Sequence, residues 1–149
     1  MPLYFAYGSN MNRAQMVRRC PQSRSVSRAV LDGFSLEFPR VCDEWGGGVA
    51  GIEPDEQATV EGVLWQISAD DLASLDGYEG IDEGEYTRCR VNVTQPDGGS
   101  VEAWTYLAVA QAGAPFAPPP RYVQTMVTGA REHGLSPQWV ARLESMAGE

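Results

Sequence analysis

The sequence predicts an α+β domain built on a mixed or closed β-sheet. Segments with strand character outnumber helical ones, and the helical segments fall mostly near the two ends of the chain. Asp97-Gly98 also separates two runs of alternating apolar and polar residues, which is the pattern of a β-hairpin. With 149 residues, 43% of them hydrophobic, the chain is long enough for one such domain, so we expect a single domain over residues 1–149.

The N-terminal segment predicts a strand, a tight polar loop and a helix. Residues 3–7 are apolar or aromatic and indicate a buried strand. Gly8 permits a sharp change of backbone direction, and Ser9 and Asn10 favour turns and helix N-caps. Residues 11–19 then have a helical pattern. Backbone N–H groups at such a helix start could hold a carboxylate or an oxyanion, although an ordinary strand-to-helix turn has the same pattern.

The remaining elements follow from periodicity and from breaker residues. In the first helix we expect Met11, Ala14 and Val17 to face the core. Further expected strands are residues 29–38, 49–52, 59–67, 87–93 and 101–109, and further expected helices are residues 69–76, 121–132 and one that opens at Ser136-Pro137. Expected loops and stops are residues 21–27, a connector over 39–44, a turn at 54–56, Gly77 after the second helix and an extended segment over 112–120.

The glycine run that follows Trp45, residues 46–48, has two interpretations. Three consecutive glycines suggest either a flexible hairpin tip or a place where another part of the backbone approaches closely.

Charge and hydropathy exclude several classes of partner. The formal net charge is −9, so little in this chain would neutralise the phosphates of a nucleic acid or bind an anionic membrane surface. No apolar stretch approaches the ~20 residues that span a bilayer, and no signal-peptide pattern opens the chain. We therefore expect a cytoplasmic protein whose partner is a small molecule, with no nucleic acid and no membrane.

Cysteine and histidine usage argues against a metal site. Cys20, Cys42 and Cys89 are odd in number and widely spaced, which indicates neither a disulfide framework nor a zinc site. His133, the only histidine, is explained by its place near the end of a helix. We therefore expect no metal and no cofactor.

A carboxylate is the most plausible acid–base group in such a chain. The candidates lie in a glycine-rich acidic segment and are Asp76, Glu79, Asp82, Glu83 and Glu85. Glu79 has glycines at positions 77 and 80 that could turn it inward, and Tyr78 could shield it from water, which would raise its pKa. A solvated acidic loop would have the same composition.

These residues resemble the γ-glutamylcyclotransferase family. The resemblance starts at Tyr4-Phe5-Ala6-Tyr7-Gly8-Ser9-Asn10 and continues through Ser74-Leu75-Asp76, Glu79-Gly80 and Gly84 with Tyr86. It extends to Pro120 with Tyr122 and to Gly129-Ala130, so it spans nearly the whole chain.

The resemblance implies a fold, an activity and a site. The fold is a small closed mixed sheet, barrel-like, with peripheral helices. The activity is cyclisation of a γ-glutamyl amino acid or related amide to 5-oxoproline, a reaction of glutathione metabolism. Glu79 would be the catalytic residue, and the substrate would be bound by Tyr7, Gly8, Ser9, Asn10, Tyr86 and Tyr122. A homodimer is also expected, with the Trp45 glycine segment or Trp139 near its interface.

Two alternatives remain open at this level. The enzyme could remove a γ-glutamyl group from a secondary metabolite by the same cyclisation. The domain could instead be a non-catalytic module that binds a small acidic ligand or a protein. The presence of Glu79 argues against the binding module, because a pure anion binder would gain by losing that charge.

Overall fold

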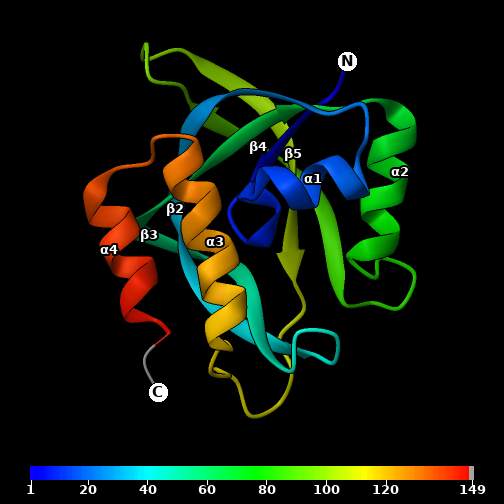
Figure 1. The fold of residues 1–149 in the computed structure, drawn as a ribbon, viewed down its shortest axis with the longest axis vertical. Coiled ribbons are helices and arrows are strands. Elements are labelled where there is room, and N and C mark those ends of the chain that lie inside the picture. The colour runs from blue at the N-terminus through cyan, green and yellow to red at the C-terminus, as the bar shows by residue number, and fades with distance from the viewer. Residues whose placement is uncertain (148–149) are drawn as a thin grey trace.

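A computed structural model describes residues 1–147 and shows a five-stranded β-barrel with four α-helices on its outside (Figure 1). The strands are β1 (Leu3–Ala6), β2 (Arg24–Cys42), β3 (Gly47–Gln66), β4 (Tyr86–Thr94) and β5 (Ser100–Ala108). The helices are α1 (Arg13–Arg19), α2 (Ala69–Tyr78), α3 (Pro120–Glu132) and α4 (Pro137–Ser145), and a 3-10 turn (Ser9–Met11) precedes α1.

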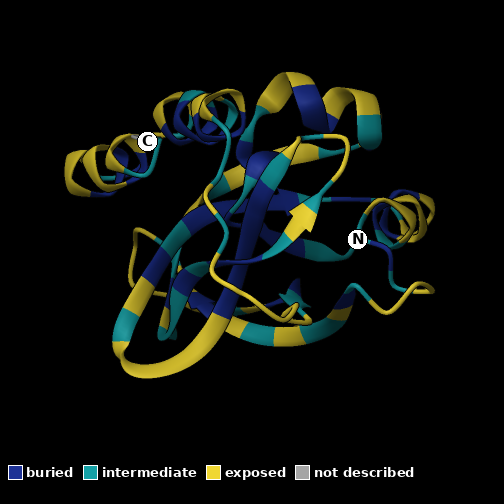
Figure 2. Cartoon of the chain, turned by 90° about the horizontal axis from the view of Figure 1, so that it is seen from below, coloured by how far each residue is buried: buried dark blue, intermediate teal, exposed yellow. Residues whose placement is uncertain are grey.

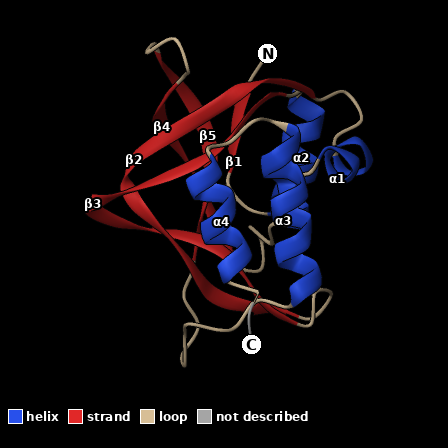
Figure 3. Cartoon of the chain, turned by 60° about the vertical axis from the view of Figure 1, so that its left-hand side comes forward, coloured by secondary structure: helices blue, strands red, loops and turns tan. Residues whose placement is uncertain are grey.

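The barrel is closed and mixed, as expected from the sequence. Its strands are hydrogen-bonded in the order β1-β3-β2-β4-β5, and β5 returns to β1. Strands β1 and β5 run parallel, whereas the other neighbouring pairs are antiparallel. The helices lie to one side of the strands, with α3 and α4 next to each other (Figures 1 and 3).

The core lies inside the barrel and beneath the helices. Phe5 and Leu64 of the barrel are fully buried, as are Leu75, Met126 and Leu143 of the helices. Buried residues, dark blue in Figure 2, lie on the strands and on the helix faces turned toward them. Within residues 1–147 no helix is both long and apolar enough to cross a membrane.

Strands β2 and β3 are longer than the sequence pattern predicts. Residues 24–27 and 39–42, expected in loops, belong to β2, and residues 54–56, expected as a turn, belong to β3. Both prolines in these segments lie beside shifts in the β2–β3 register: Pro39 within one, Pro54 opposite the end of another. Proline cannot donate a ladder hydrogen bond, and a bulge tolerates it, so pairing with the opposite strand overrides the local turn signal.

Two glycines of the run, Gly47 and Gly48, serve close packing, whereas Gly46 lies in the turn between β2 and β3 with a positive φ of 79° and open space around it. A Cβ atom on Gly48 would collide with the backbone of Phe116, and the Gly48 N–H donates to the carbonyl of Ala117 at 2.9 Å. The extended segment before α3 therefore lies directly on the start of β3. This contact places Phe116 at the wall of the cavity described below.

The buried face of α1 differs from the expected one. Ala14 and Val17 are exposed, whereas Gln15 and Met16 are buried, and of the expected set only Met11 is in the core. The 3-10 turn causes the difference, because it delays the start of α-helical geometry and so rotates the face that meets the barrel.

Two helix N-termini have the capping bonds that the sequence predicts. Ser68 accepts from Asp71 N–H at 3.0 Å and Ser136 from Trp139 N–H at 3.1 Å, as the sequence predicts. Helix α2, however, continues through Gly77, so the prediction that Gly77 ends it is wrong.

The expected β4–β5 hairpin is confirmed. Trp139 is buried in the chain and so presents little surface, and its expected place near a dimer interface stays a prediction.

Candidate active site

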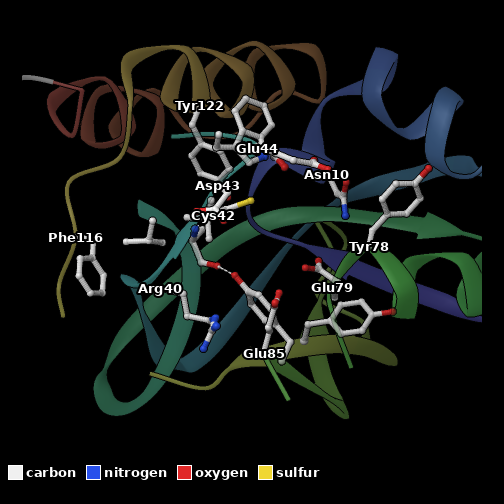
Figure 4. Close-up of a pocket in the computed structure, with 18 of the residues that line it drawn as sticks. Asn10, Arg40, Cys42, Asp43, Glu44, Tyr78, Glu79, Glu85, Phe116 and Tyr122 are labelled. Carbon is white, nitrogen blue, oxygen red and sulfur yellow. Dashed lines mark hydrogen bonds between the residues drawn. The ribbon is translucent and has the colours of Figure 1, made fainter. Parts of the chain in front are cut away.

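A cavity of about 1040 Å³ opens beside the end of β1. Its walls come from the loop after β1, the β2–β3 connection, the end of α2, the start of β4, the extended segment before α3, and α3 itself. All seven residues predicted as a site from the sequence line it: Tyr7, Gly8, Ser9, Asn10, Glu79, Tyr86 and Tyr122. Figure 4 shows the labelled side chains converging on this space.

The loop after β1 is held by its own polar side chains. The Gln15 side-chain amide donates to the Ser9 hydroxyl and to the side-chain oxygen Oδ1 of Asn10, both at 2.7 Å. Arg19 donates to the same Asn10 oxygen at 3.1 Å, and the Asn10 amide donates to the Tyr4 hydroxyl at 3.0 Å. These bonds fix the shape of the loop.

Gly8 is needed where the loop meets α3. A Cβ atom at Gly8 would lie 3.0 Å from the Tyr122 hydroxyl, tighter than ordinary van der Waals contact. That hydroxyl accepts from the backbone N–H of Ala50 at 3.0 Å, and the edge of the Trp45 ring packs on Tyr122 with 4.8 Å between ring centroids. Burial raises the pKa of Tyr122 to about 12, so Tyr122 is a neutral wall of the cavity at physiological pH.

Two further tyrosines are tethered to the backbone. The Tyr86 hydroxyl donates to the carbonyl of Ala50 at 2.7 Å, and the Tyr7 hydroxyl donates to the carbonyl of Tyr106 at 2.6 Å. Burial raises the pKa of both hydroxyls above the ordinary tyrosine range. The cavity is therefore walled by neutral rings whose positions are fixed by hydrogen bonds.

Glu79 lies at the end of α2, and Figure 4 shows it among the side chains that face the cavity. The residue as a whole is only half-buried, but its carboxyl group is enclosed, and burial raises the pKa of Glu79 to about 7. The positive charge of Arg19 opposes this rise, and the negative charges of Glu85 and Asp76 add to it. A carboxyl with this pKa can both accept and donate a proton at neutral pH.

Tyr78 does not shield Glu79 as the sequence suggested. Tyr78 is 56% exposed, and Arg19 stacks over its ring at 4.6 Å from the centroid. The carboxyl group is shielded instead by five buried tyrosine rings that line the cavity. The negative charge of Glu79 raises the pKa of each of them, so they lie close to it: Tyr4, Tyr7, Tyr86, Tyr106 and Tyr122.

Sequence reasoning missed several cavity residues because only the fold brings them there. Tyr4, Tyr106, Arg19 and Arg40 line the cavity, and buried Gln15 supports it from behind. Gln15 and Arg19 lie on the first helix, where the apolar periodicity pointed to a different face. The sequence offered one signal for this support: Gln15 is a polar residue between the apolar residues Ala14 and Met16.

The histidine occupies a structural place, and one of the three cysteines, Cys42, lines the cavity. His133 caps α3, and its ring packs edge-on to Trp65 at 5.2 Å, where burial lowers its pKa. Cys20, Cys42 and Cys89 are free thiols. Within residues 1–147 no group of three or more His, Cys, Asp and Glu side chains is placed to hold a metal ion.

Comparison with known proteins agrees with this geometry. The model of the AIG2-like family matches residues 59–143, which include Glu79 and all of α3. Gamma-glutamylcyclotransferases from human and mouse are 32% and 31% identical over 148 residues, covering 97% of this chain and 78% of theirs. A solved structure titled "Gamma-glutamyl cyclotransferase" superposes with a TM-score of 0.92 at 30% identity, covering 97% of this chain and 86% of that one.

A more distant structure shares the fold alone. A yeast protein titled as a γ-glutamyl cyclotransferase specific to glutathione superposes with a TM-score of 0.67 at 12% identity, covering 98% of this chain and 95% of that one.

The matching relatives define an enzyme of the γ-glutamylcyclotransferase type. The chain belongs to the AIG2-like family, and the human and mouse relatives that it resembles are γ-glutamylcyclotransferases.

Proposed function

We propose that this protein converts a γ-glutamyl amino acid, or a related γ-glutamyl amide, to 5-oxoproline and a free amine. The observation that carries the proposal is the Glu79 carboxyl group, whose pKa burial raises to about 7, in a cavity it shares with the loop over residues 7–10. Relatives at 31–32% identity named for this activity support the reaction class.

The substrate supplies both reacting groups. Its α-amine is the nucleophile and its γ-amide carbon is the electrophile, so the enzyme mainly has to hold the substrate in the attacking shape. The amine nitrogen forms a bond to the γ-carbon, and the bond from that carbon to the departing nitrogen breaks. The proton that the ammonium must lose first goes to Glu79, which later delivers a proton to the departing nitrogen.

The loop after β1 would stabilise negative charge during this step. In our proposal, N–H groups of Gly8, Ser9 and Asn10 bind either the glutamyl carboxylate or the oxyanion that develops on the γ-carbonyl. The hydrogen bonds from Gln15 and Arg19 support both roles, because they hold the loop in one shape before the substrate arrives. Tyr86 and Tyr122 would enclose the glutamyl chain and exclude water.

Incubation with γ-glutamyl-alanine tests the proposal, with 5-oxoproline, alanine and glutamate followed by mass spectrometry. We expect equal amounts of 5-oxoproline and alanine from the wild type. Glu79→Gln should keep the fold and lose about 10²–10⁴ in kcat, the usual share of general acid–base catalysis. Glu83→Gln is the matched control, because Glu83 is an exposed acid four residues away.

Two results would contradict the proposal. Free glutamate in place of 5-oxoproline would mean that water attacks the γ-carbon, so the reaction would be hydrolysis. Unchanged turnover in Glu79→Gln would remove Glu79 from the proton transfer.

A further inference from the structure

The cavity contains two arginines that lie on different sides of it. Arg19, at the end of α1, lies on the same side of the cavity as Glu79, whose pKa its charge lowers. It donates a hydrogen bond to the side-chain oxygen of Asn10 at 3.1 Å. Arg40, near the end of β2, donates to the carbonyl of Val109 at 2.8 Å. Figure 4 shows Arg40 across the cavity from Asn10. Positive charge is thus available at two separate places.

Arg40 keeps most of its binding capacity. A guanidinium carries five N–H donors, and none of the ion pairs formed within residues 1–147 includes Arg40. The bond to Val109 therefore orients the side chain while leaving donors for another group. A planar guanidinium held in this way is suited to a carboxylate, which it can bind through two parallel hydrogen bonds.

The other charges of the cavity make such a cation necessary for an anionic substrate. Four acidic residues line the cavity: Asp43, Glu44, Glu79 and Glu85. A γ-glutamyl amino acid carries two carboxylates at neutral pH. One stays with 5-oxoproline, and the other leaves with the amino acid. Each would be repelled by these acids unless it meets an arginine.

The position of Glu79 decides which carboxylate Arg40 meets. The α-amine must reach Glu79, so the glutamyl part lies on that side, and the departing part extends away from it. Resting on the proposed function, we propose that Arg40 binds the carboxylate of the departing amino acid. Arg40 is then a specificity-determining residue that favours γ-glutamyl amino acids over γ-glutamyl amines.

Two substrates that differ only in this carboxylate test the inference. They are γ-glutamyl-alanine and γ-glutamyl-ethylamine, assayed with the wild type, Arg40→Gln and Arg40→Lys. Gln keeps a polar amide but has no charge, whereas Lys keeps the charge. Arg24→Gln is the control, because Arg24 is exposed and does not line the cavity. Circular dichroism establishes that each variant is folded.

We expect Arg40→Gln to lower kcat/KM for γ-glutamyl-alanine about 10- to 100-fold, mainly through KM, as for loss of a charged hydrogen-bonded contact. The value for γ-glutamyl-ethylamine should change by less than about threefold, and Arg40→Lys should restore part of the preference. An equal loss of kcat/KM on both substrates would mean that Arg40 has a structural role, and no loss on either would mean that Arg40 does not bind substrate. Either result overturns the inference about Arg40 and leaves the proposed function standing. If the wild type forms 5-oxoproline from neither substrate, the proposed function fails and the inference with it.

Discussion

Arg19 and Glu79 act on each other through the cavity, and their balance sets the pH at which Glu79 can accept a proton. Burial raises the pKa of Glu79 to about 7, whereas the positive charge of Arg19 lowers it. A base must be deprotonated before it can act, so activity should rise as the pH increases through about 7. Without Arg19 the carboxylate would lose a stabilising charge, and its pKa would rise further.

Replacing Arg19 with Gln should therefore move the acidic limb of the pH–rate profile to higher pH. The measurement is kcat/KM for γ-glutamyl-alanine across neutral pH. Arg18→Gln serves as the control, since Arg18 is its exposed neighbour and does not line the cavity. The free substrate's amine has the same pKa in the assays of the wild type, Arg19→Gln and Arg18→Gln. A difference in the position of the acidic limb therefore comes from the enzyme. A limb that stays in place, or that moves to lower pH, would contradict this account of Glu79.

At the scale of elements, the end of α2 is what positions Glu79. Asp76, three residues before it, accepts from the Tyr106 hydroxyl at 2.7 Å and from Arg88 at 2.9 Å. Tyr106 belongs to β5 and Arg88 to β4, so one carboxylate fastens the last turn of α2 to two barrel strands. The pair with Arg88 is about one-third exposed, and solvent weakens it accordingly.

Asp76→Asn should loosen this attachment. The new amide cannot accept from both donors with full charge, and we expect a loss of about 1–3 kcal/mol in the free energy of unfolding, together with a lower kcat. Glu102→Gln is the matched control, because it breaks the exposed Arg90 pair and should cost less than about 1 kcal/mol. Urea denaturation and turnover measure the two effects. Equal losses of stability in both variants would show that Asp76 is no more than another surface charge.

The elements differ in how far the sequence could predict them. The β4–β5 hairpin and the N-cap of α4 were predictable because each depends on residues within a few positions, Asp97-Gly98 and Ser136. The true lengths of β2 and β3 were not, because prolines 39 and 54 signal turns locally and only pairing across the hairpin overrides them.

The residues of the candidate site also divide into those that the sequence could predict and those that it could not. The loop over residues 7–10 and Glu79 were identifiable through motifs, whose members are neighbours in the sequence. Arg40 and Tyr106 were not, since their places in the cavity depend on contacts with Val109 and Asp76 that closure of the barrel creates. Gln15 was missed because the 3-10 turn changed the helix face that periodicity indicated.

At the scale of the whole molecule, the barrel holds a group that opposes its stability. The carboxyl of Glu79 has a pKa of about 7 in the folded protein, above the ordinary value of about 4.3 expected in the unfolded chain. The folded state therefore binds the proton more tightly. Its stability is unaffected below the unfolded pKa, falls as the pH rises between the two values, and carries the full penalty above about 7.

Glu79→Gln should consequently be more stable than the wild type at high pH, although it is less active. Gln has nearly the shape of the protonated acid and cannot ionise, so the two proteins should unfold with similar free energies near pH 4. At about pH 8 the variant should gain about 1–3 kcal/mol. Urea unfolding at both pH values measures this, and exposed Glu83→Gln should show no such difference. A Glu79→Gln variant no more stable than the wild type at high pH would mean that its carboxyl is solvated. The protein would then lack the perturbed acid on which its proposed chemistry depends.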